Sequence, residues 1–160
     1  MKKQGMQNWL RHPVSRMIAF AVFYAITLGF DATGVRSEIR SPDSLTAVFT
    51  ICGERRRVNC VVDGDTFWFD RQKIRIADID APELSPPRCA YERKKGETAK
   101  RRLLELLNAG AFSLSSKDRD KDRYGRMLRI VTRSGHSIGT VLVKEGLARP
   151  WGGARRPWCD

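Results

Sequence analysis

The stretch Val61–Glu83 constrains the fold more than any other part of the chain, because it combines strand-forming alternation with a concentration of acidic residues. Apolar side chains alternate with other residues over Val61–Phe69 and again over Lys73–Ile79, which predicts two β-strands. Gly64 and Asp70–Gln72 are expected to supply the bends. The pattern therefore predicts a sheet whose strand ends carry charged residues.

The acidic residues of this stretch stand around Arg75. They are Asp63, Asp65, Asp78, Asp80 and Glu83. Pro82 ends the second run, so Glu83 is expected at the exit of a strand. Neighbouring carboxylates repel one another unless a cation or a charged ligand offsets the repulsion. The cluster therefore predicts a site for such a cation or ligand.

Single residues of the cluster also have plainer explanations. Asp63 fits a role in capping the turn at Gly64. Asp78 is expected to be a surface or salt-bridge residue, and Arg75 is also suited simply to pairing with the aspartates.

The remaining pattern predicts a small antiparallel barrel with helices on one side. Further strands are expected at Leu45–Cys52, Val58–Val62, Ala111–Ser115 and Met127–Thr132. Apolar residues recur at helical spacing from about Glu92 to Asn108 and over Ser137–Glu145. The charged segment Ser116–Arg126 is expected to be a loop.

Residues 1–37 have the features of a signal peptide or membrane anchor. A basic start precedes the apolar run Met17–Phe30, which is shorter than the roughly 20 apolar residues of a spanning helix. Cleavage near Gly34 or Ser37 is favoured, and an uncleaved anchor over residues 13–30 is the alternative. A linker at 38–44 and a domain at 45–160 follow, so the protein is expected to be secreted or periplasmic, or anchored to the membrane.

Charge predicts an anionic partner for this domain. The chain holds 30 Lys and Arg against 18 Asp and Glu, a formal net charge of +12. Among the basic residues only Lys2, Lys3, Arg11 and Arg16 precede position 35, so most of the excess belongs to the domain. Nucleic acid is the commonest polyanion for such a surface. A solubilising surface and attraction to anionic lipid fit the charge equally well.

The 4 cysteines predict disulfides rather than a metal site. None of them forms a CxxC pair, and both histidines are far from any cysteine pair, so a zinc site is poorly supported. An even count with an export signal favours two disulfides. Cys52 and Cys60 flank an expected hairpin, so their pairing is the simplest choice and leaves Cys89 with Cys159. The other connectivities, and four buried thiols, remain open.

Four motifs follow one another as VVDGDT, IRIADIDAPE, DRYGR and VLVKEGLA. In this order and spacing they resemble the staphylococcal nuclease (thermonuclease) family, over roughly Val58 to Trp151. The resemblance implies a mainly β fold with α: an OB-fold-type five-stranded barrel with two or three packed helices. It also implies a calcium-dependent phosphodiesterase that cleaves DNA and RNA and leaves 3′-phosphate products.

The resemblance also implies a metal site. Asp65 and Asp80 match the calcium carboxylates, and Ala81 would supply a main-chain carbonyl where the family often has threonine. Calcium takes oxygen ligands, so these groups suit it.

Catalytic and substrate-binding roles follow from the same motifs. Arg75 and Arg126 match two phosphate-clamping arginines, and Glu83 matches the proposed general base. Tyr124 matches a substrate-contacting tyrosine, and Arg123 takes a position where a lysine is familiar. A base-stacking aromatic has no clear counterpart, since Trp151 is near its place but out of register.

Two other functions compete with this hypothesis. A non-catalytic OB-fold module binds single strands in a basic groove with aromatic platforms, but it has no need for a general base or an arginine pair. A membrane-tethered protein that uses its basic surface on lipid rests only on the leader and the charge. The favoured prediction is a monomeric nuclease with DNA and RNA as substrates and no stable membrane partner once the leader is cleaved.

Overall fold

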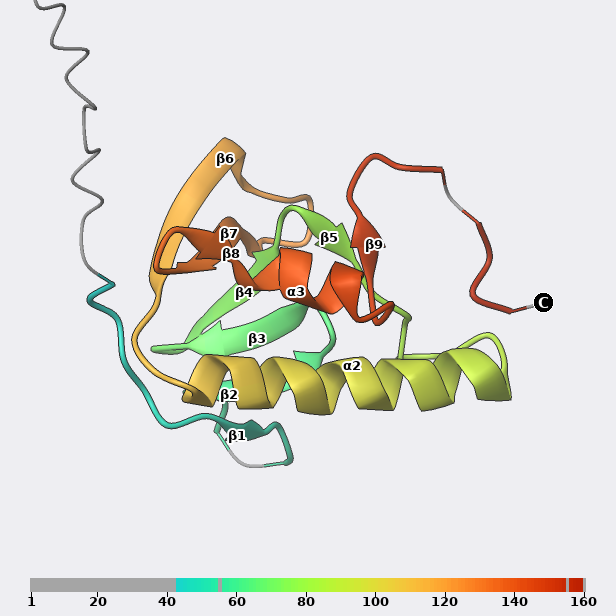
Figure 1. Ribbon diagram of the computed structural model, residues 1–160. Coiled ribbons are helices and arrows are strands. Elements are labelled where there is room, and N and C mark those ends of the chain that lie inside the picture. The colour runs from blue at the N-terminus through green and yellow to red at the C-terminus, as the bar shows by residue number, and fades with distance from the viewer. Residues whose placement is uncertain (1–42, 55, 155, 160) are drawn as a thin grey trace, which may run out of the picture. The chain divides into compact units, whose positions relative to one another are not determined.

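The computed structural model describes residues 43–54, 56–154 and 156–159 (Figure 1). The expected leader, most of the expected linker and Arg55 of the expected hairpin tip lie outside the described residues. None of the helices in the described part of the chain has the length and hydropathy needed to cross a membrane.

A mixed sheet carries most of the strands. Its order is β1-β2-β3-β4-β7-β6, with β8 paired to β7. The strands are β1 (Thr50–Ile51), β2 (Cys60–Asp63), β3 (Thr66–Phe69), β4 (Gln72–Ile76), β6 (Ser113–Lys121), β7 (Met127–Arg133) and β8 (His136–Ser137). A second, two-stranded sheet pairs β5 (Ile79–Asp80) with β9 (Arg149–Pro150).

The sheet is not the antiparallel barrel that the sequence pattern predicts. β1 pairs with β2, and β4 with β7, in parallel. The two outer strands approach each other only through the bridge between Leu45 and Phe112, so no ladder closes the described strands into a barrel. The mixed sheet with its two described helices agrees with an OB-like fold, whereas the expected closure is wrong for the described residues.

Two strand expectations are corrected by the observed pairing. Ser116–Arg126 is not a loop throughout, because β6 continues to Lys121 and pairs with β7 on both sides of a register shift. The strand is exposed on both faces beyond Ser115, so its sequence lacks apolar alternation. The expected strand Leu45–Cys52 shrinks to β1, since the chain before it makes only the bridge at Leu45.

The bend at Gly64 is required by close packing. A Cβ at this position would lie 2.7 Å from the Cβ of Ala99 and 2.9 Å from that of Ala81. Only glycine therefore lets the turn between β2 and β3 rest against the long helix. Asp63 and Asp65 flank Gly64, so this contact also determines how close they lie to α2.

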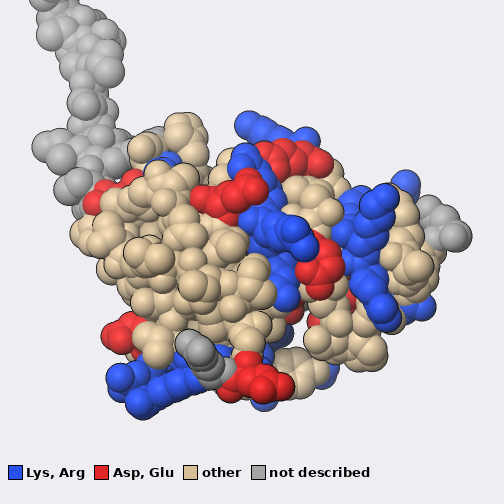
Figure 2. Space-filling view, turned by 90° about the horizontal axis from the view of Figure 1, so that it is seen from below, with Lys and Arg blue, Asp and Glu red and all other residues tan. Residues whose placement is uncertain are grey.

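Two helices pack against the sheets. α2 (Ala90–Asn108) has Cys89 as its N-cap, and the Sγ of Cys89 accepts a hydrogen bond from the Glu92 N–H. α3 (Ile138–Lys144) has Ser137 as its N-cap, and the hydroxyl of Ser137 accepts a hydrogen bond from the Thr140 N–H at 3.1 Å. α2 packs against β2 and β1 and contacts α3 (Figure 1). Figure 2 shows Lys and Arg side chains at several separate places on the face seen from below, with Asp and Glu side chains between them.

One apolar core lies between these layers. Its largest fully buried side chains include Phe67, Phe112, Ile74, Ile76 and Leu103, which come from β3, the segment before β6, β4 and α2. Ile74 and Ile76 point inward from β4. The alternating residues Lys73 and Arg75 therefore point to the outer face. The core thereby places Arg75 at the candidate site.

The expected disulfide pairing is confirmed in the structure. Cys52 bonds to Cys60, and Cys89 bonds to Cys159. The second bond ties the start of α2 to the C-terminal segment.

The two disulfides should contribute unequally to stability, because they close loops of different length. Replacing Cys89 and Cys159 together by alanine should lower the free energy of unfolding by about 4 kcal/mol, since these residues are 70 apart in sequence. Replacing Cys52 and Cys60, which are 8 apart, should cost about 2–3 kcal/mol. Urea denaturation without reductant measures both, and a larger loss from the short loop would contradict the expectation.

Candidate active site

The guanidinium of Arg75 joins the two predicted metal carboxylates. Its Nη2 lies 2.9 Å from Asp65 Oδ2 and 3.5 Å from Asp80 Oδ1. Its Nη1 donates to the main-chain carbonyls of Ile76 at 3.1 Å and Ile79 at 3.2 Å. Arg75 is buried, so these acceptors replace the water that its charge would otherwise keep. The pairing of Arg75 with the aspartates, the plainer of the two expectations, is thus observed.

The turn after β2 and strand β5 place Asp65 and Asp80 next to Arg75. Asp65 follows the glycine turn and is buried, with its Oδ1 accepting from the Thr66 hydroxyl at 2.8 Å. Its Oδ2 also accepts from the Ala81 N–H at 3.3 Å, which links the turn to the end of β5. Asp80 lies in β5, whose pairing with β9 brings Arg149 opposite it.

Two further carboxyl groups, those of Asp63 and Glu83, lie near Asp65. Burial raises the pKa of Asp63 to about 7, and the charges of Asp65 and Glu83 add to the rise. Asp63 Oδ1 accepts from the Asp65 N–H at 3.4 Å, which confirms its role in capping the turn. Glu83 is exposed just past β5, so the structure places this predicted base near Asp63 and on the solvent side of the cluster.

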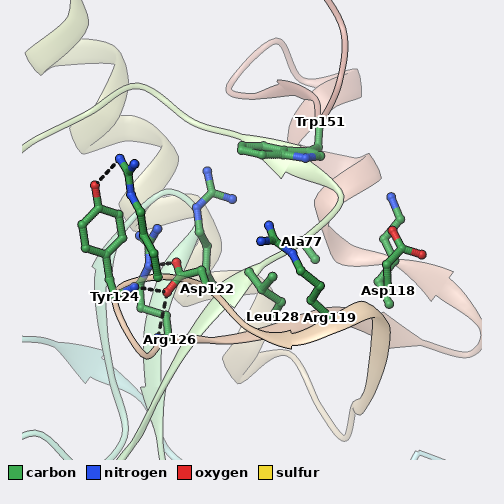
Figure 3. A pocket seen from close by; sticks show the side chains of 11 residues that line it. Ala77, Asp118, Arg119, Asp122, Tyr124, Arg126, Leu128 and Trp151 are labelled. Atoms are coloured by element: carbon green, nitrogen blue, oxygen red, sulfur yellow. Dashed lines mark hydrogen bonds and ion pairs between the residues drawn. The ribbon is translucent and has the colours of Figure 1, made fainter.

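The second predicted arginine lies in a hollow that Arg75 also lines. This hollow has a volume of about 490 Å³. Arg126 is held there by Asp122, whose Oδ2 accepts from its Nε at 2.7 Å (Figure 3). Burial opposes ionisation of Asp122, but hydrogen bonds from Arg126 and from the Tyr124 N–H hold the pKa of this carboxyl below its usual range. Asp122 therefore stays charged and fixes the direction of the guanidinium.

Aromatic rings border the same hollow. Trp151 lies across one side of it, and Arg119 extends toward the middle from β6 (Figure 3). The Arg75 guanidinium carbon is 4.7 Å from the centre of the Trp151 ring. Tyr124 is 68% exposed, and its hydroxyl accepts from Arg123 Nη2 at 2.6 Å. The structure thus brings Arg75, Arg126, Arg123 and Tyr124 together, whereas Glu83 does not line this hollow.

Comparisons with known proteins agree with this arrangement. The family model described as Staphylococcal nuclease homologue matches residues 73–156, which is more than half of the chain. The chain belongs to the staphylococcal nuclease homologue family. This membership covers β4, both helices and the hollow, and it confirms the resemblance seen in the motifs.

Several curated relatives share this part of the chain. "Endonuclease YncB" of Bacillus subtilis (strain 168) is 37% identical over 93 residues, 55% of this chain and 44% of that protein. "Thermonuclease" of Staphylococcus hyicus is 33% identical over 96 residues, 56% of this chain and 54% of that protein. An "Uncharacterized endonuclease" of Haemophilus influenzae is 34% identical over 116 residues, 66% of this chain and 60% of that protein. The chain thus spans less than two thirds of the length of each of these relatives.

The donor chemistry of this family member fits a hard cation. Asp65 and Asp80 converge on one nitrogen of Arg75, so oxygen donors from two separate elements meet at one place. Within the described residues no group of three or more His, Cys, Asp or Glu side chains is arranged to hold a metal ion. Asp65 and Asp80 are therefore the carboxylates available to a candidate centre, and the expected role of the Ala81 carbonyl stays a prediction.

Arg149 is a site residue that sequence reasoning missed. Its Nε donates to Asp80 Oδ2 at 3.0 Å, and its guanidinium carbon lies 4.0 Å from the centre of the Trp158 ring. A cation at Asp80 would compete with this contact. No motif marks Arg149, because the pairing depends on the contact between β5 and β9.

Asp78 is not the surface or salt-bridge residue that the sequence suggests. Its Oδ2 accepts from the Ser137 hydroxyl and its carbonyl accepts from the Trp151 N–H at 2.9 Å. A Cβ on Gly139 would approach Asp78 Oδ1 to 2.9 Å, so the carboxylate packs against the start of α3. Asp78 thus fixes both the helix and the tryptophan that borders the hollow.

Glu92 is a second missed residue, and it holds the loop that carries Glu83. It is 1% exposed, and its carboxyl oxygens accept from the Arg88 N–H at 2.6 Å and the Glu83 N–H at 3.4 Å. The sequence signal is weak, because a glutamate near a helix start usually remains solvated.

Replacing Glu92 by alanine should destabilise the protein by about 1–3 kcal/mol, because two main-chain N–H groups lose their acceptor. Glu97→Ala on the exposed side of the same helix is the matched control and should change the free energy of unfolding by no more than about 0.5 kcal/mol. Thermal and urea unfolding measure both variants. Equal stability of the two would show that Glu92 does not hold the loop.

Proposed function

We propose that the protein is an exported, calcium-dependent nuclease that hydrolyses phosphodiester bonds of DNA and RNA and leaves 3′-phosphate ends. The observation that carries the proposal is the position of Arg75, which contacts Asp65 and Asp80 and also lines the hollow that contains Arg126. The acidic site and the paired arginines therefore meet in one place. Membership of the family supports the same activity.

The arginines suit the binding of a phosphodiester. A guanidinium presents parallel N–H donors that match two phosphate oxygens and stays charged at any physiological pH. The contact with Asp122 occupies Nε of Arg126, so its two terminal nitrogens remain for a phosphate. Arg123 and Tyr124 at the rim would contact the substrate beside it.

Glu83 is suited to accept the proton of the attacking water. It is exposed, and no hydrogen bond or ion pair engages its carboxylate in the described part of the chain. The Glu83 N–H donates a hydrogen bond to Glu92, which holds the main chain from which the Glu83 carboxylate extends. Positioned carboxylates are effective general bases when a water lies within hydrogen-bonding reach.

Calcium, when bound, would polarise a phosphoryl oxygen and orient the substrate. Asp65, Asp80 and the Ala81 carbonyl would hold it, and Arg149 would release Asp80 for this purpose.

Export is supported by the disulfides. Both pairs of cysteines are bonded in the structure, and such bonds persist in oxidising compartments such as the periplasm and the extracellular space. We also infer that the protein acts as a monomer. With the expected leader cleaved, we infer a secreted or periplasmic protein.

The purified protein should degrade single-stranded DNA and RNA in the presence of calcium and should stop when a chelator is added. The reason is that two carboxylates and a carbonyl supply the oxygen donors calcium prefers. Gel assays and end analysis of the products measure the activity and the 3′-phosphate. Cleavage that persists in chelator would refute the calcium requirement, and binding without any cleavage would favour the non-catalytic OB-fold module.

Arg126→Ala should lower kcat/KM by about a hundredfold to a thousandfold, because a donor to the developing charge is lost. Glu83→Gln should lower kcat by about a hundredfold or more, since the amide cannot accept a proton. Arg56→Ala and Glu97→Gln make the same chemical changes at exposed positions outside the hollow and should leave the rate unchanged. Wild-type rates in both site variants would exclude these roles.

A further inference from the structure

We propose that the C-terminal segment sets the calcium affinity of the site, because it holds Arg149 on Asp80 and a bound metal ion has to displace this guanidinium. The inference rests on the proposed calcium-dependent function and adds a residue that controls occupation of the metal site. The segment comprises the described residues after β9, which are 151–154 and 156–159. Arg149 acts through Asp80 and not on the substrate, so it is a positioning residue.

Both carboxylate oxygens of Asp80 are engaged by guanidinium groups. Asp80 Oδ1 lies 3.5 Å from Arg75 Nη2, and Asp80 Oδ2 accepts from Arg149 Nε at 3.0 Å. A metal ion at this carboxylate would meet the positive charge of both arginines at short range. Binding of the metal is therefore favoured when one of the two arginines moves away.

Arg149 is better placed to leave than Arg75. Arg75 is buried, and its Nη1 also donates to the main-chain carbonyls of Ile76 and Ile79. Arg149 reaches Asp80 from β9, and its side chain is 22% exposed. A buried guanidinium that loses its acceptors is costly, whereas a partly exposed one exchanges them for water.

A small hollow beside the Arg149–Asp80 pair gives the arginine side chain room to move. The hollow has a volume of about 100 Å³. It is lined by Asp80, Arg149, Pro150, Trp151, Gly152 and Gly153. Because the pair itself forms part of the wall, Arg149 has space to turn away from Asp80 while β9 stays paired with β5.

The C-terminal segment supplies the contacts that keep Arg149 in place. The guanidinium carbon of Arg149 lies 4.0 Å from the centre of the Trp158 ring, and its Nη1 donates to the Arg156 carbonyl. The neighbouring Cys159 is bonded to Cys89, which keeps the ring close to the start of α2. A cation–π contact is favourable only while the ring is held near the charge. The tied segment therefore favours the ion pair over a bound metal ion.

Arg149→Gln should tighten the dissociation constant for calcium by about threefold to tenfold, because a competing charge at Asp80 is lost. Titration of the purified chain with calcium chloride in a calorimeter measures this constant without any substrate. Arg149→Lys keeps the charge and should remain close to wild type. Arg101→Gln is the matched control, since it makes the same chemical change at an exposed position of α2 and should leave the constant unchanged.

Loosening the segment should act in the same direction as removing the arginine. Trp158→Ala should tighten the calcium dissociation constant by about twofold to fivefold, the range of one exposed cation–π contact. In the Arg149→Gln background the same change should add no further gain, because the residue that the ring holds is then absent. A separate gain from each change would show that the ring does not act through Arg149.

The disulfide of the segment gives a second way to loosen it. Cys89→Ser/Cys159→Ser should also tighten the calcium dissociation constant, because the ring is then no longer tied to α2. Cys52→Ser/Cys60→Ser removes the disulfide that lies outside the segment and should not change the constant. Circular dichroism shows whether each variant folds. If the first does not fold, the single substitutions above still decide the question.

The outcomes separate this inference from the proposed function. If calcium neither binds to the wild type nor supports cleavage of single-stranded DNA, the proposed function itself is wrong. If the wild type binds calcium and Arg149→Gln binds it with equal or lower affinity, Arg149 does not compete with the metal and the inference fails. Equal tightening by Arg101→Gln would reveal a general effect of charge, which also overturns the inference.

Discussion

The buried guanidinium of Arg75 is the interaction on which the rest of the site depends. It is held by two carboxylates from different elements and by two main-chain carbonyls, so it connects β4 to the glycine turn and to β5. A buried charge that loses a partner is costly, which favours a single arrangement of these elements. The same group borders the hollow beside Trp151, so folding and the proposed binding of substrate depend on one residue.

The scaffold around this residue is arranged to limit its movement. Gly64 rests against Ala99 of α2, and Glu92 of the same helix holds the loop after β5. One helix therefore supports both sides of the acidic cluster. The opposite wall is the turn between β6 and β7, where Asp122 orients Arg126 through a local contact. Packing and hydrogen bonds to α2 thus hold the acidic cluster, whereas local hydrogen bonds hold the turn that carries Arg126.

Sequence patterns predicted the parts of the fold that depend on local signals. The helices, the bend at Gly64 and both disulfides follow from periodicity, glycine and cysteine spacing. β6 was missed beyond Ser115, because an edge strand exposed on both faces carries no apolar alternation. Arg149 could not be found in this way, because its partner Asp80 lies 69 residues away in the sequence. Glu92 was missed because it contacts Glu83, 9 residues earlier, across the loop before α2. The family motifs identify residues by order, whereas these contacts exist only in three dimensions.

The bond between Cys89 and Cys159 makes most of the second half of the chain a covalent ring. The ring includes α2, the β6–β7 turn with its exposed basic residues, and β9. A protease that cuts the exposed turn at Arg123 therefore opens the ring without releasing a fragment, and Arg126 stays attached to the body that holds Arg75. The two pieces of such a nicked molecule stay covalently joined in an oxidising environment, and the bond between them is lost where thiols reduce it.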